Sequence, residues 1–168
     1  MEERRTAAAE ARPPISNGGG EELLLRFISA VSVTLHEMAG IESVVRSARQ
    51  GLDNRQDDIS AVLRITSTTA GSLILTFPYR TATAIARRVL EGVTTEPDDG
   101  MIQDCMGEVA NVVAGQAKAM LAETSFHFVF SMPEVLVGHP AETRPDQEPP
   151  LVAVLTSDLG EFAIRLRL

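Results

Sequence analysis

The sequence is poor in the residues that build disulfides and zinc sites. Its 168 residues include one cysteine, Cys105, and three histidines that lie far apart in the chain. A single cysteine excludes an internal disulfide. One cysteine and three dispersed histidines also disfavour the tetrahedral ligand sets that hold zinc. We therefore expect no metal site and no bound cofactor of its own in this chain.

The sequence also lacks long apolar runs and an excess of positive charge. No apolar stretch approaches the roughly 18 residues that span a bilayer, and the charged N-terminus has no apolar signal-peptide centre. The formal net charge is −8. Such a chain is repelled by the phosphates of nucleic acid and by anionic membrane surfaces. These features predict a cytoplasmic protein that binds neither nucleic acid nor membrane.

The length suits one domain preceded by a short tail. Residues 1–20 combine alanines, two adjacent prolines and three adjacent glycines without apolar periodicity, which is typical of a disordered tail. A single folded domain is predicted over residues 21–168.

Apolar periodicity predicts the same series of elements twice within this domain. The predicted elements are a helix over 21–38, a strand over 44–50, a hairpin over 59–77 with its turn at 68–71, a helix over 80–90, a helix over 101–122, a strand over 126–130 ended by Pro133, and a hairpin of strands 151–156 and 161–168. The order indicates an α+β fold: a mostly antiparallel sheet packed by helices, made of two pseudo-repeated units of one helix and three strands.

The helix over 101–122 carries the most informative pattern. At about 100° per residue, its polar side chains form one narrow stripe opposite an apolar face. The stripe consists of Asp104, Glu108, Asn111, Gly115 and Lys118. A solvated surface is one interpretation, since most polar helix stripes are that.

Two features of the stripe favour a function. Asn111 is a poor helix former in mid-helix. Gly107 and Gly115, which flank the Glu108–Asn111 pair, each cost about 0.5–1 kcal/mol relative to alanine. Close approach of another protein would explain these glycines, and close packing between helices is the alternative.

The motif Asp104-x-x-x-Glu108-x-x-Asn111, followed by Pro133, resembles the signature of the CheC/CheX/FliY phosphatase family. The order of elements over residues 21–168 is similar as well. Of the three asparagines, Asn111 alone has a glutamate three residues before it, and the helix over 21–38 has no such pair. CheC-like members commonly carry the motif in both units and CheX-like members in one, so the chain resembles the CheX type.

The resemblance implies a phosphatase that hydrolyses the aspartyl-phosphate of a CheY-like response regulator. Asn111 would orient the attacking water, and Glu108 would pair with the lysine of the receiver domain. We expect Asp104, Gly107, Gly115 and Lys118 to line the surface that contacts the receiver. The Mg²⁺ of the reaction would belong to the receiver, because two carboxylates are too few ligands for a dedicated site.

The resemblance further implies a homodimer made through strands at a sheet edge, for which we expect the final strand, 161–168. Two alternatives remain open for function: a non-catalytic adaptor that binds a receiver, and a component of the flagellar switch. For Cys105 we expect a small buried side chain rather than a redox sensor. The phenylalanines at 126, 128 and 130 are expected in the core.

Overall fold

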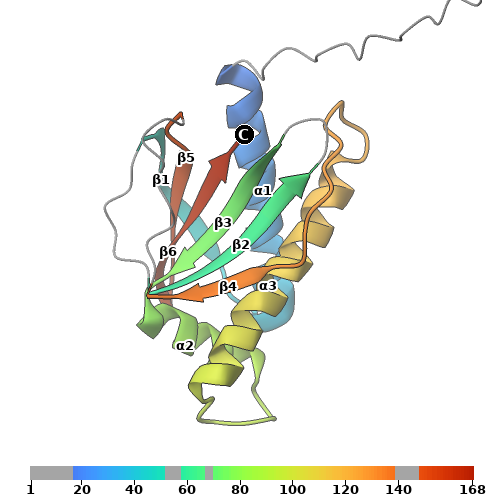
Figure 1. The fold of residues 1–168 in the computed structure, drawn as a ribbon. Coiled ribbons are helices and arrows are strands. Elements are labelled where there is room, and N and C mark those ends of the chain that lie inside the picture. The colour runs from blue at the N-terminus through green and yellow to red at the C-terminus, as the bar shows by residue number, and fades with distance from the viewer. Residues whose placement is uncertain (1–16, 52–57, 67–69, 139–147) are drawn as a thin grey trace, which may run out of the picture.

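The computed structural model describes residues 17–51, 58–66, 70–138 and 148–168 (Figure 1). Within these ranges the chain forms three helices and six strands. In chain order they are α1 (Asn17–Ala39), β1 (Ser43–Gln50), β2 (Ile59–Thr66), β3 (Ala70–Phe77), α2 (Tyr79–Val89), α3 (Asp99–Leu121), β4 (Glu134–Val137), β5 (Leu151–Ser157) and β6 (Gly160–Arg167).

The six strands form one sheet in the order β1-β5-β6-β3-β2-β4, and every neighbouring pair is antiparallel. This order confirms the two predicted units and shows how they interlock. The single strand of each unit pairs with the hairpin of the other: β1 with β5, and β4 with β2. The return strands β3 and β6 meet at the centre. The sheet therefore has an approximate two-fold axis between its two middle strands.

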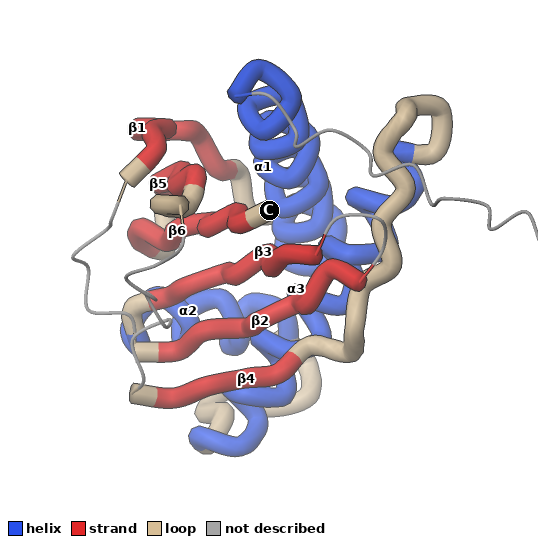
Figure 2. Tube along the Cα trace, turned by 45° about the horizontal axis from the view of Figure 1, so that its top comes forward, coloured by secondary structure: helices blue, strands red, loops and turns tan. Residues whose placement is uncertain are grey.

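The core lies between the sheet and the two long helices, α1 and α3, which cover one face (Figure 2). Alternate residues of the central strands point into it and meet in register, for example Leu75 opposite Ile164. The rings of Phe77 and Phe162 stack with centroids 5.6 Å apart. Burial of each such side chain stabilises the fold by about 1.5–3 kcal/mol.

The strand predicted over 126–130 is wrong, although its phenylalanines are in the core as expected. Only Phe130 makes a bridge, to Ile65 of β2. Phe128 is buried, and its ring contacts those of Phe126, Phe130 and Phe27 of α1. Packing of the rings satisfies the apolar alternation without a regular ladder. The strand starts later instead, directly after Pro133, whose nitrogen cannot donate to a ladder.

Two further predictions need correction. The helix α1 begins at Asn17, so residues 17–20 of the predicted tail are helical, and residues 1–16 lie outside the described ranges. The final strand, β6, is not a sheet edge, because β3 pairs with its outer side. The edges are β1 and β4. Residues 67–69 of the predicted turn and 139–147 of the loop also lie outside the described ranges.

Candidate functional site

The helix α3 starts at a defined cap. The Asp98 side chain accepts a hydrogen bond of 2.8 Å from the Met101 amide, and Asp99 places a negative charge in the first turn. Both contacts favour a helix start at this point. The Tyr79 hydroxyl donates to the Asp99 carboxylate and so joins the first residue of α2 to that of α3. This hydrogen bond is the main reason why the pKa of Tyr79 is raised.

The two faces of α3 separate as the sequence predicts. Nine residues of its apolar face are buried, among them Met106, Val109 and Val113. Asp104, Glu108, Asn111, Gly115 and Lys118 are all exposed. Because the buried face fixes the rotation of the helix, the polar stripe is held outward on a rigid support. Glu108 and Asn111 are three residues apart and therefore project from the same side of the helix.

Three polar side chains of the stripe make no hydrogen bond or ion pair within the described part of the chain. No hydrogen bond or ion pair joins Asp104, Glu108 or Asn111 to another described residue. An amide and a carboxylate without a partner among the described residues can be contacted by a molecule that docks on α3. Across the described ranges, no group of three His, Cys, Asp or Glu side chains is arranged to hold a metal ion. The exposed carboxylate and amide on one helix face suit docking and the positioning of a bound molecule.

The two glycines of α3 have different surroundings. A Cβ added at Gly107 would lie 3.3 Å from Cγ2 of Val135, so this glycine lets α3 lie close to the edge strand β4. A Cβ added at Gly115 would meet no atom within 4 Å. Packing inside the molecule accounts for Gly107. Gly115 faces open space one turn beyond Asn111, where the absence of a side chain leaves room for a partner.

Cys105 is part of the core and not of the stripe. It is 6% exposed, and burial, together with the nearby charge of Glu108, raises its pKa to about 11. The thiolate is the reactive form of cysteine, and it is scarce at neutral pH with such a pKa. This environment agrees with the expected structural role.

Two contacts that support α3 could not be read from the sequence. The side chain of Gln116 donates to the carboxylate of Glu37 on α1 over 2.9 Å, and the hydroxyl of Thr124 donates to the Leu121 carbonyl over 2.7 Å at the end of the helix. The sequence signal for the start of α3 was present, since adjacent aspartates before a periodic segment indicate a cap.

Comparison with known proteins adds independent information. The family described as chemotaxis phosphatase CheX matches residues 59–156 of the chain. The search of curated proteins found no match to this chain. No described helix has the length and apolar character needed to cross a membrane.

Several solved structures share the fold. A chemotaxis protein CheX from Desulfovibrio desulfuricans is 28% identical, with a TM-score of 0.77 over 86% of this chain and 97% of that chain. A putative chemotaxis protein from Desulfovibrio vulgaris Hildenborough is 30% identical, with a TM-score of 0.75 over 86% and 95%. The structure of a CheX–CheY–BeF3–Mg²⁺ complex from Borrelia burgdorferi is 22% identical, with a TM-score of 0.69 over 87% and 98%.

Proposed function

This chain belongs to the CheX family of chemotaxis phosphatases, and from that membership we propose that it hydrolyses the aspartyl-phosphate of a CheY-like response regulator with Glu108 and Asn111. In the reaction, water adds to phosphorus while the bond from phosphorus to the aspartyl oxygen breaks. The products are inorganic phosphate and the free carboxylate of the receiver. The solved complex of a Borrelia burgdorferi CheX with CheY, which has the same fold, supports a receiver as the partner.

The observation that carries the proposal is Asn111 in mid-helix, which is exposed and has no hydrogen-bond partner among the described residues. Its side-chain amide can both donate to and accept from a water molecule. A water molecule held in line with phosphorus attacks faster than one that is free to move, because its positioning lowers the barrier to hydrolysis. The packing of α3 against the core fixes the position of this amide on the surface.

Glu108 would dock the helix. Its exposed carboxylate lies one turn before Asn111, so both side chains can enter one pocket of the receiver. A charge-assisted hydrogen bond from the receiver's lysine would orient the helix. Asp104 extends the negative surface, Lys118 ends the stripe with a positive charge, and Gly115 leaves space for the partner's surface.

The Mg²⁺ of the reaction fits the receiver better than this chain. Asp104 and Glu108 offer two carboxylates on an exposed helix face, and the octahedral shell of Mg²⁺ needs more ligands than that. When bound in the receiver, the ion would neutralise charge on the phosphoryl oxygens. The contribution of this chain is the amide that positions water and the carboxylate that docks.

The exposed edge strand β1 supports a homodimer. Seven of its eight residues, Val44–Gln50, are exposed, and Val44 and Val45 are 64% and 46% exposed. An unpaired edge with exposed valines is a ready template for a second strand. A dimer through β1 leaves the α3 stripe of each chain free for one receiver. Because receivers of this kind are cytoplasmic, we also infer a cytoplasmic location.

Phosphate release from a panel of phosphorylated receivers of the same genome tests the proposal. The wild-type chain should accelerate release from at least one receiver, and Asn111→Ala should reduce that acceleration by about 100-fold, the scale of a lost positioning contact. Ser29→Ala, an exposed polar residue of α1, is the matched control and should leave the rate unchanged.

The same assay separates the alternatives. Receiver binding without acceleration by the wild-type chain would identify an adaptor and contradict the phosphatase. Equal rates for wild type and Asn111→Ala would contradict the role of the amide. Binding to flagellar switch proteins with no receiver bound would favour the structural alternative.

A further inference from the structure

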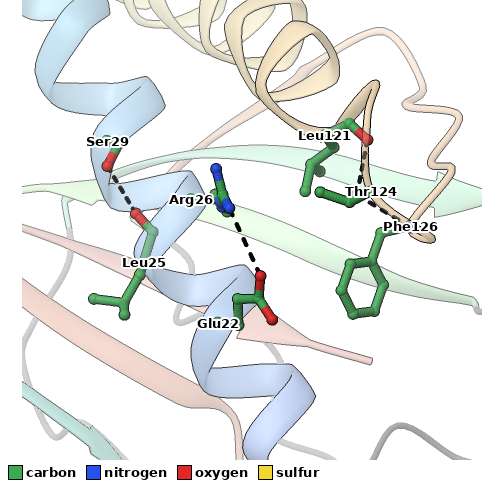
Figure 3. Close-up of polar contacts among 7 residues, drawn as sticks. All are labelled: Glu22, Leu25, Arg26, Ser29, Leu121, Thr124 and Phe126. Carbon is green, nitrogen blue, oxygen red and sulfur yellow. Dashed lines mark hydrogen bonds and ion pairs between the residues drawn. The ribbon is translucent and has the colours of Figure 1, made fainter.

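The chain turns back at the end of α3 and returns along the outer side of β2. At the turn, the Thr124 hydroxyl donates to the Leu121 carbonyl over 2.7 Å and accepts from the Phe126 amide over 3.2 Å (Figure 3). The first hydrogen bond from β2 to the returning chain comes from the Thr66 amide, and the last stretch of this chain is β4. Residues 129–137, the edge segment, therefore form one edge of the sheet.

One extra residue interrupts the pairing of the edge segment with β2. The pairs on either side of the interruption are Phe130 with Ile65 and Glu134 with Val62. Between these pairs lie two residues of β2 (63 and 64) and three of the edge segment (131–133). An extra residue of this kind is a β-bulge, which re-aims side chains and is frequent at sheet edges and beside active sites.

The bulge presents Met132 to solvent. Ser131 still pairs with Arg64 through a backbone hydrogen bond of 2.9 Å, so Met132 and Pro133 share the position opposite Leu63. Pro133 suits a bulge because its nitrogen has no hydrogen to donate to a ladder. Met132 is 79% exposed, more than any other large hydrophobic side chain in the described ranges. A methionine held in this way is an apolar, adaptable contact for another molecule.

The edge segment borders the polar stripe of α3. Gly107 faces it, since a Cβ added at Gly107 would lie 3.3 Å from Cγ2 of Val135 in β4. Asn111 lies only about 40° around the helix from Gly107. On the other flank of the stripe, about 140° from Asn111, Gln116 donates to Glu37 of α1. A molecule that contacts Asn111 is therefore closer to the edge segment than to α1.

We propose that Met132, held outward by the bulge, is an apolar contact for the receiver that docks on α3 and so helps to determine which receiver this chain binds. The inference rests on the proposed function. Glu108 and Asn111 would address the phosphorylation site, a chemical group common to all phosphorylated receivers. A neighbouring apolar side chain adds affinity only where the partner offers an apolar surface of matching shape, which makes Met132 a specificity-determining residue.

Titration calorimetry tests the proposal with the receiver that gives the fastest phosphate release in the panel, activated by beryllofluoride. Met132→Ser should weaken binding about tenfold, the scale of an apolar interface anchor. Met132→Leu keeps an apolar side chain of similar volume and should bind within about twofold of the wild type. Val93→Ser is the matched control, because Val93 is 75% exposed in the turn after α2, and its affinity should equal that of the wild type. Equal affinities for the wild type and Met132→Ser would overturn the proposal.

Two further readouts separate an interface contact from a role in the fold. At saturating receiver, Met132→Ser should release phosphate within about twofold of the wild-type rate, because a contact made equally in the bound state and the transition state changes KM and not kcat. The loss of affinity should be the same at low and high salt, whereas the loss in Glu108→Ala should shrink as salt screens the charge. A fall in kcat with an unchanged KM would overturn the proposal.

The alternative occupant of the edge segment is a second copy of the chain. Light scattering on a sizing column should give the same mass for the wild type and Met132→Ser, and a lower mass for the variant would overturn the proposal. Failure of the wild type to release phosphate from any receiver would contradict the proposed function. Hydrolysis by the wild type, together with equal receiver binding by Met132→Ser, would contradict this inference alone.

Discussion

The two halves of this molecule, one starting at α1 and the other at α3, share their interior and differ on their surface. When α3 is aligned with α1 at an offset of 82 residues (Asp99 with Asn17), most buried positions coincide, as at Cys105 and Leu23. The strands of the two halves interlock across the middle of one sheet. On the exposed side of the helices, α3 has an acid and an amide, Glu108 and Asn111. At the corresponding positions α1 has a base and a hydroxyl, Arg26 and Ser29. The buried residues of each helix fix which face it presents to solvent, and the few exposed residues on that face set its chemistry.

The two sheet edges extend this comparison. The edge strand of the second half, β4, has four residues and lies under α3, where Gly107 allows close contact with Val135. The edge strand of the first half, β1, has eight residues, seven of them exposed. The edge strand β4 therefore lies next to the helix that carries the proposed docking face, and it is shorter and less exposed than β1. The proposed docking face and the proposed dimer edge would then lie at opposite ends of the sheet.

The largest effect is expected where the halves join. A Cβ at Gly71 of β3 would lie 2.2 Å from the carbonyl oxygen of Arg167 in β6, a backbone atom that cannot move without breaking the central pairing. We expect Gly71→Ala to lower the free energy of unfolding by about 3 kcal/mol or more. Urea denaturation measures this change.

Gly115→Ala is the matched control for Gly71→Ala. It adds the same methyl group to an open helix position, where alanine is favoured over glycine by about 0.5–1 kcal/mol. Stability should therefore rise in this variant. A loss of less than 1 kcal/mol in Gly71→Ala would show that the junction between the halves is more tolerant than the backbone contact implies.

The next effect concerns the charged residues of the two helices. Glu108→Ala should weaken binding of a beryllofluoride-activated receiver by about 1.5–3 kcal/mol, the scale of a hydrogen bond to a charged group. Arg26→Ala, at the corresponding position of α1, should leave the affinity of the α3 site unchanged. Titration calorimetry at low salt compares them. Equal affinities for wild type and Glu108→Ala would remove this residue from the docking surface.

A smaller effect is expected at the sheet edges. Val44→Lys places a charge on the exposed edge strand β1 and should weaken a dimer by about tenfold, or about 1.4 kcal/mol. Val93→Lys is the control, because Val93 is 75% exposed in the turn after α2 and lies on no strand. Light scattering on a sizing column measures the mass. A single-chain mass for the wild type would contradict the dimer.

The sequence predicts the elements of the site better than their arrangement. Each helix was located to within a few residues, because its apolar residues recur at helical spacing over many turns. The outward stripe of α3 follows from the same periodicity. The alternating phenylalanines wrongly predicted a strand over 126–130. Residues that alternate in the sequence can pack into a core from an irregular segment as well as from a strand.

Contacts between distant segments were out of reach of sequence periodicity. The strand order places β6 at the centre of the sheet, and no local pattern distinguishes a central strand from an edge strand when both alternate. The bond from Tyr79 to Asp99 and the contact of Gly107 with Val135 depend on which elements meet. The exposed stripe of α3 was therefore predictable, and the contacts that hold this helix in place were not.

The smallest effect is expected at Cys105, which occupies the buried position that Leu23 has in α1. Both side chains serve the core, but one of them can titrate. Burial raises the pKa of the Cys105 thiol from 9.0 to about 11. We expect alkylation by iodoacetamide at pH 8 to be slow and to follow the fraction of unfolded chain.

The raised pKa of Cys105 also sets how the stability of the fold depends on pH. The thiol is protonated in both states below about pH 9, so stability there is independent of it. Between about pH 9 and 11 the unfolded chain loses this proton first, and stability falls. Cys105→Ala should lack that component of the fall, and the difference between the two stability profiles isolates it. Rapid alkylation of the folded wild type at pH 8 would show that the Cys105 thiol is accessible to solvent. It would contradict a buried position in the core like that of Leu23.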